Sequence, residues 1–110
     1  MNYQYINKHQ DRITLHVTCE IFRQFIDGTK TTEYRPVNGQ YFNTFEKLRT
    51  MYRIVPHYRC TVRIYEAYKS NYIDFFCMGI TIKSLSECPP EVSRIYRTLY
   101  TAFYALHLIR

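Results

Sequence analysis

The residues from Arg12 to Ile21 alternate between apolar and polar side chains, and this pattern constrains the fold more than any other feature of the chain. The apolar set is Ile13, Leu15, Val17, Cys19 and Ile21, and the polar set is Arg12, Thr14, His16, Thr18 and Glu20. Successive side chains of an extended strand point to opposite faces. The alternation therefore predicts one β-strand that is buried on one side and exposed on the other.

A return strand and a helix are expected next. Asp27-Gly28 is typical of a hairpin turn, because glycine tolerates the positive φ that tight connections need, and the β-prone segment 31–35 follows it. Asn43 and Glu46 have the spacing of a capping pair. Apolar residues then recur at helical spacing until Pro56, at Phe45, Leu48, Met51, Tyr52 and Val55.

The second half of the chain repeats this order. Residues 59–66 alternate again, and Ser70-Asn71 leads into an apolar strand at 72–83, where Gly79 predicts a bulge. Pro89-Pro90-Glu91 is typical of a helix start. An apolar stripe then predicts a helix running to the C-terminus through Val92, Ile95, Tyr96, Leu99, Ala102, Phe103 and Leu106.

These elements predict an α+β fold with the order ββαββα. Two hairpins would form a four-stranded antiparallel sheet with both helices on one face, a two-layer arrangement. The tetrapeptides at 49–52 (RTMY) and 97–100 (RTLY) resemble each other, so an internal duplication is possible. The length predicts a single domain over residues 11–110, and the polar residues 1–10 are expected to form a loose N-terminal arm.

Composition favours a binding protein. The chain has 12 tyrosines, and its 15 Lys and Arg outnumber 9 Asp and Glu, which gives a net charge of +6. Tyr and Arg dominate binding surfaces, and positive charge attracts polyanions such as nucleic acid. The start of the chain lacks a signal sequence and no segment has the length of a membrane span, so we expect a cytoplasmic protein with reduced cysteines and no membrane partner.

Two binding surfaces are predicted. The polar sides of two strands would bind nucleic acid or a nucleoprotein through Arg12, His16, Arg59, Arg63 and Tyr65. A flank of the C-terminal helix would bind a protein or close a homodimer through Tyr96, Arg97, Tyr100, Tyr104 and His107. The second surface leads to the alternative function, an inhibitor or adaptor of the kind that phages and mobile elements use to block host or defence proteins.

Catalysis and cofactors are not predicted. The chain lacks phosphate-binding glycine loops, HExxH-like motifs and paired carboxylates. His57 and Cys60 have the spacing of zinc ligands, but Cys77 and Cys88 are too far apart to complete a regular site, so no metal is expected. A small nuclease or a cysteine hydrolase is the remaining enzymatic alternative, and the main expectation is binding without catalysis.

Overall fold

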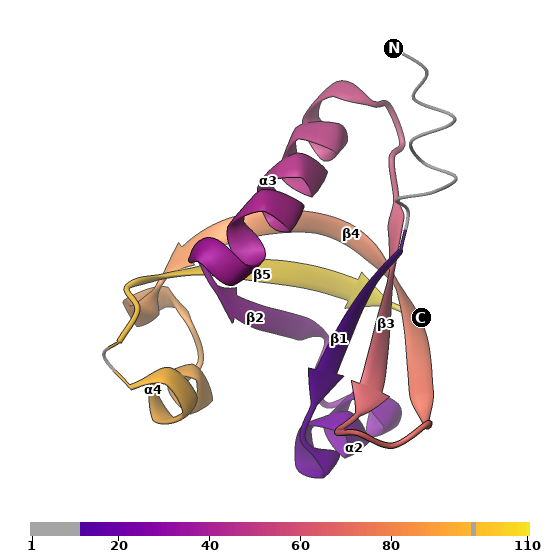
Figure 1. The fold of residues 1–110 in the computed structure, drawn as a ribbon, viewed down its shortest axis with the longest axis vertical. Helices are drawn as coiled ribbons and strands as arrows, with labels where there is room; N and C mark the ends of the chain where they lie inside the picture. The colour runs from indigo at the N-terminus through magenta and orange to yellow at the C-terminus, as the bar shows by residue number, and fades with distance from the viewer. Residues whose placement is uncertain (1–11, 98) are drawn as a thin grey trace.

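The computed structural model describes residues 12–97 and 99–110, which form one curled sheet with helices packed against it (Figure 1). The elements in chain order are β1 (Arg12–Val17), α2 (Cys19–Asp27), β2 (Thr32–Pro36), α3 (Gly39–Ile54), β3 (Cys60–Glu66), β4 (Tyr72–Ser84), the 3-10 helix η1 (Leu85–Glu87), α4 (Pro90–Tyr96) and β5 (Ala102–Ile109). The predicted N-terminal arm, residues 1–10, lies outside the described residues.

The sheet is a half-barrel with the strand order β1-β3-β4-β5-β2 (Figure 1). β1 pairs parallel with β3, and the other three pairings are antiparallel. The α+β class is confirmed, whereas the predicted four-stranded antiparallel sheet with the order ββαββα is wrong. β1 and β2 are the two edges of the curled sheet.

The first alternating segment changes from strand to helix at Thr18. The Thr18 hydroxyl accepts a hydrogen bond from the Ile21 amide at 3.3 Å and caps α2, which ends at Gly28 with a φ of 83°. Gly28 therefore ends a helix, where a hairpin turn was predicted. Because α2 intervenes, β1 and β2 do not form a hairpin and lie at opposite edges of the sheet.

The C-terminal segment differs most from its prediction. The helix begins at the predicted prolines but ends at Tyr96, and Arg97 takes a positive φ of 56°. Residues Ala102–Ile109 then form β5, which lies between β4 and β2. Because β5 is central and covered on both faces, its residues form a nearly continuous apolar run that also fits a helical stripe. RTMY lies within α3, whereas Arg97, Leu99 and Tyr100 lie outside helices, so the described part of the chain shows no repeated ββα unit.

The main core lies on the concave side of the half-barrel, where α2 and α3 cover it (Figure 1). Its fully buried strand residues include Cys60, Val62, Ile64, Cys77, Tyr104 and Leu106. The alternation at 59–66 and the β3–β4 hairpin are confirmed, and the register shift between Cys77 and Gly79 confirms the predicted bulge. The first helix of the prediction is confirmed as α3, but it starts at Gly39 after the N-cap Asn38, so the predicted capping pair of Asn43 and Glu46 is wrong.

Candidate functional site

The convex side of the sheet carries a grid of nine side chains from three adjacent strands, which we call the outer face. These are Arg12, Thr14 and His16 of β1, Thr61, Arg63 and Tyr65 of β3, and Tyr72, Asp74 and Phe76 of β4. Each strand pairing puts one residue opposite the next, so the grid forms cross-strand rows. All nine are exposed or half-buried, while the alternate residues Cys60, Val62 and Ile64 of β3 are fully buried.

One row of the outer face is aromatic. Tyr65 lies opposite His16 on one side and opposite Tyr72 on the other. The His16 and Tyr65 rings stack with centroids 5.3 Å apart, and the Tyr65 and Tyr72 rings follow at 5.4 Å. Tyr68, which is almost completely exposed, extends the row with its ring 6.3 Å from His16. The structure thus places four rings in a line across the end of the sheet.

Arg63 is held over the Tyr72 ring of this row. Its guanidinium donates two hydrogen bonds to the Asp74 carboxylate, at 2.9 and 3.0 Å, and its central carbon lies 3.9 Å from the centroid of the Tyr72 ring. These hydrogen bonds from Arg63 hold the pKa of Asp74 below its ordinary value. The ion pair therefore fixes the guanidinium plane, and it also neutralises the one acid of the outer face.

His16 is fixed by the turn that follows β3. Its Nδ1 donates to the Ala67 carbonyl at 2.8 Å, and the Ala67 amide donates to the Val17 carbonyl at 2.6 Å. Ala67 takes a positive φ of 47°, which is uncommon for a residue with a Cβ. The Ala67 amide thus holds the end of β1, and the Ala67 carbonyl orients the His16 ring.

The other end of the outer face is apolar and basic. Phe76 lies opposite Thr61 and Ile109, and 48% of Phe76 and 46% of Ile109 are exposed. Arg12 is exposed on β1 in the same row, and the exposed Arg59 directly precedes β3. All five residues predicted to bind nucleic acid therefore lie on or beside one surface.

The predicted protein-binding stripe does not lie on one helix. Tyr104 is completely buried in β5, and His107 lies on the same strand with its Nε2 3.0 Å from the Thr81 hydroxyl. Tyr96 and Tyr100 are half-buried against each other, while Arg97 is exposed at the end of α4. The single C-terminal helix predicted to carry this surface is therefore wrong, because residues 102–109 form a central strand. Binding of a partner or a second copy through the residues that are still exposed stays a prediction.

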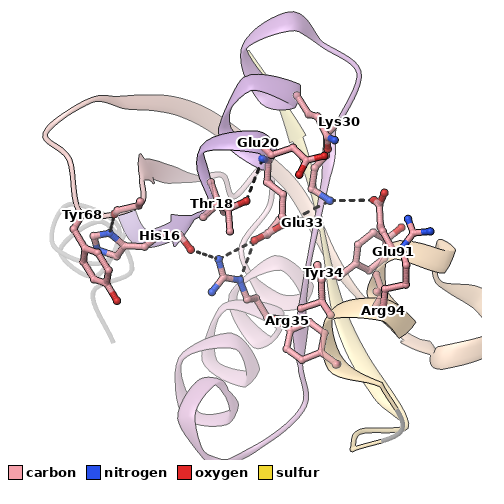
Figure 2. A pocket seen from close by; sticks show the side chains of 17 residues that line it. His16, Thr18, Glu20, Lys30, Glu33, Tyr34, Arg35, Tyr68, Glu91 and Arg94 are labelled. Atoms are coloured by element: carbon pink, nitrogen blue, oxygen red, sulfur yellow. Dashed lines mark hydrogen bonds and ion pairs between the residues drawn. The ribbon is translucent and has the colours of Figure 1, made fainter.

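A pocket of about 620 Å³ opens between the two edges of the half-barrel (Figure 2). Arg35 of β2 spans the gap there, with Nη2 donating to the His16 carbonyl at 3.0 Å and Nε donating to Glu33 at 3.0 Å. Burial lowers the pKa of Arg35, but the Glu33 carboxylate and the Tyr41 hydroxyl together more than offset this, so the pKa is raised overall. Sequence reasoning missed this pocket, because residues far apart in the chain line it.

The described part of the chain contains no cluster of side chains that could bind a metal ion. No group of three or more His, Cys, Asp and Glu side chains close enough to hold a metal ion occurs among residues 12–97 and 99–110. Cys60 and Cys77 lie opposite each other on β3 and β4, and both are completely buried. Among the helices of residues 12–97 and 99–110, none is long and apolar enough to cross a membrane.

Tyr72, Asp74 and Phe76 are site residues that sequence reasoning missed. Their positions alternate with the buried Ile73 and Phe75, so the period of two was available as a signal. Their contact with β3 depends on the register of the hairpin, which the structure supplies.

No protein-family model matches this chain, and comparison with curated proteins and with solved structures found no match either. Function is therefore inferred from the geometry of the outer face and the pocket.

Proposed function

We propose that the protein binds single-stranded nucleic acid on its outer face. The observation that carries this proposal is the aromatic row of His16, Tyr65 and Tyr72, with the Arg63 guanidinium over the Tyr72 ring. Unpaired bases stack on aromatic side chains and on guanidinium planes presented by an open sheet. A paired base keeps its faces covered by its neighbours in the duplex, so this surface suits single strands.

Charge supports a polyanionic ligand. Arg12 and Arg59 are exposed, and Asp74 is neutralised by Arg63. Basic side chains flanking stacking rings allow phosphates to be contacted while bases lie on the rings. The net charge of +6 adds long-range attraction to a nucleic-acid strand.

The proposed role is binding without catalysis. His16 is bonded to the Ala67 carbonyl, and Arg63 is bonded to Asp74. Glu66, which directly follows Tyr65 on β3, accepts a hydrogen bond from the Asn71 side-chain amide at 3.1 Å. Each of these side chains already has a hydrogen-bond partner, and the arrangement favours holding a ligand over activating a nucleophile.

Fluorescence anisotropy tests the proposal. Labelled single- and double-stranded DNA and RNA are titrated with the protein at low and physiological salt, and we expect the single strands to bind more tightly. Phe76→Ala and Tyr72→Ala should each weaken binding, by roughly five- to one-hundred-fold for one lost stacked base. Phe42→Ala is the matched control, because Phe42 is 47% exposed but lies on α3.

Two results would contradict the proposal. One is the absence of single-strand binding at low salt, and the other is equal loss of affinity in Phe42→Ala and Phe76→Ala. The first result would favour the alternative of an inhibitor or adaptor that binds a protein.

A further inference from the structure

The pocket between the sheet edges begins where the aromatic row ends. His16 and Tyr68 belong to the row and also line the pocket, and Figure 2 shows them at one end of it. Glu91 and Arg94 of α4 lie at the other end, with Glu33 and Arg35 between. The outer face and the pocket therefore form one continuous path around the β1 edge.

The walls of the pocket suit a flat, partly polar ligand. Tyr34 of β2 and Tyr96 of α4 contribute half-buried rings, and Val17, Ile21 and Val92 contribute apolar surface. Small-molecule sites of roughly 300–1,000 Å³ are typically lined in this way, with a few polar groups that set orientation. The volume of about 620 Å³ is ample for one nucleoside.

Glu33 supplies a directional polar group in this pocket. Only 5% of Glu33 is exposed, and its Oε2 accepts a hydrogen bond from Nε of Arg35. Its Oε1 lies 3.8 Å from the Lys30 ammonium, which is longer than a hydrogen bond. A carboxylate has about four acceptor positions, so Oε1 retains capacity for an N–H donor from a ligand.

We propose that this pocket holds one unstacked base of the bound strand, with a preference for a base that presents amino hydrogens. This inference rests on the proposed function, because the strand must first lie on the outer face. A strand that follows the row past His16 reaches the pocket mouth without leaving aromatic surface. Guanine presents a ring N–H beside an amino group, which matches a carboxylate acceptor, whereas thymine and uracil flank their single N–H with two carbonyl oxygens that a carboxylate repels.

A position scan tests this. Labelled oligo(dT) of about ten nucleotides is the parent probe, and a single guanine replaces thymine at each position in turn. We expect one position, and not the others, to raise affinity by roughly tenfold. The same scan in oligo(U) distinguishes RNA from DNA as the source of the base.

Gln24 offers a matched pair of variants. It lines the pocket from α2, and its hydrogen bonds to Thr29 and Lys30 use only its backbone carbonyl. Gln24→Trp fills the pocket and should abolish the gain from guanine while oligo(dT) affinity is unchanged. Gln24→Ala enlarges the pocket and should retain the gain. Ile95→Trp on α4 is a second filling variant, at a residue that is 56% exposed.

The two proposals fail in different ways. If no position favours guanine, or if the gain survives in both tryptophan variants, the pocket inference is overturned while binding to the outer face stands. If oligo(dT) does not bind, or if Tyr72→Ala and Phe76→Ala leave its affinity unchanged, the proposed function itself is overturned.

Discussion

The hydroxyl of Tyr104 donates a hydrogen bond of 2.8 Å to Oε2 of Glu46, and so joins the central strand β5 to α3 across 58 residues of sequence. Tyr104 is completely buried, and its ring packs edge-on against Phe45 at 5.1 Å. Glu46 is also paired with Arg49 at 2.8 Å. The tyrosine that the helical pattern placed on a docking surface is therefore a core residue with one polar contact.

Removing that contact should destabilise the fold. Tyr104→Phe is expected to lower the free energy of unfolding by about 1–2 kcal/mol, because a hydrogen bond to a charged acceptor is lost while the ring remains. Urea denaturation at neutral pH measures the change. Tyr100→Phe, a half-buried tyrosine near α4, is the control and should change stability by less than about 0.5 kcal/mol. Equal effects of the two variants would show that the Glu46 bond contributes nothing.

The same bond predicts a dependence on alkaline pH. Burial, together with the Glu46 carboxylate, raises the pKa of Tyr104 from 10.0 to about 12. The folded state therefore holds this proton more tightly than the unfolded state, so the contribution to stability is complete below pH 10 and is lost as pH rises to about 12. Tyr104→Phe lacks this proton, so urea midpoints at about pH 9 and pH 11.5 should fall less in the variant than in the wild type. An equal loss of stability in the variant and in the wild type would contradict the raised pKa of Tyr104.

Arg35 holds the two edges of the half-barrel together. It donates to Glu33, to the Tyr41 hydroxyl on α3 and to the His16 carbonyl on β1. Arg35→Met should cost about 3 kcal/mol in urea denaturation, because it leaves the buried Glu33 carboxylate without its main partner. The double variant Arg35→Met with Glu33→Met should be less destabilised than Arg35→Met alone, since no buried charge remains. A double variant that is worse than the single one would show that packing, not charge, determines the effect.

Salt titrations of binding affinity should distinguish the contribution of charge from that of stacking on the outer face. Replacing both Arg12 and Arg59 by alanine should make the dependence of log affinity on log salt shallower by about 1.4, if each contacts one phosphate of a single strand. Phe76→Ala should lower affinity at every salt concentration without changing the slope, because a stacked ring releases no counterions. An unchanged slope in the arginine variant would place the phosphate contacts elsewhere.

The four cysteines should differ in reactivity. Cys60 and Cys77 are completely buried, whereas Cys19 and Cys88 are half-buried. Treatment of the folded protein with an alkylating reagent should therefore modify two cysteines, and all four should react in denaturant. Burial raises the pKa of Cys88, which will slow its reaction. Peptide mass spectrometry identifies the modified residues, and native labelling of Cys60 or Cys77 would contradict the packing of the β3–β4 hairpin.

Local patterns in the sequence predicted much of the outer face. The alternation of β1 and β3 put Arg12, His16, Arg63 and Tyr65 on the polar sides of strands, and the structure shows these sides on one convex surface. This succeeded because the side-chain period of a strand depends on the backbone alone. α3 and the β3–β4 hairpin were predicted for similar local reasons.

Only the tertiary structure decided the parallel pairing of β1 with β3, the identity of β5 and the existence of the pocket. Residues 102–109 are apolar on both sides, and such a run fits a helix or a buried strand equally well. β4 and β2 settle the choice by pairing with it on both edges, which satisfies its backbone hydrogen bonds and buries Tyr104. The sequence alone determined which faces of the strands are polar, while long-range pairing determined which of those faces remain exposed.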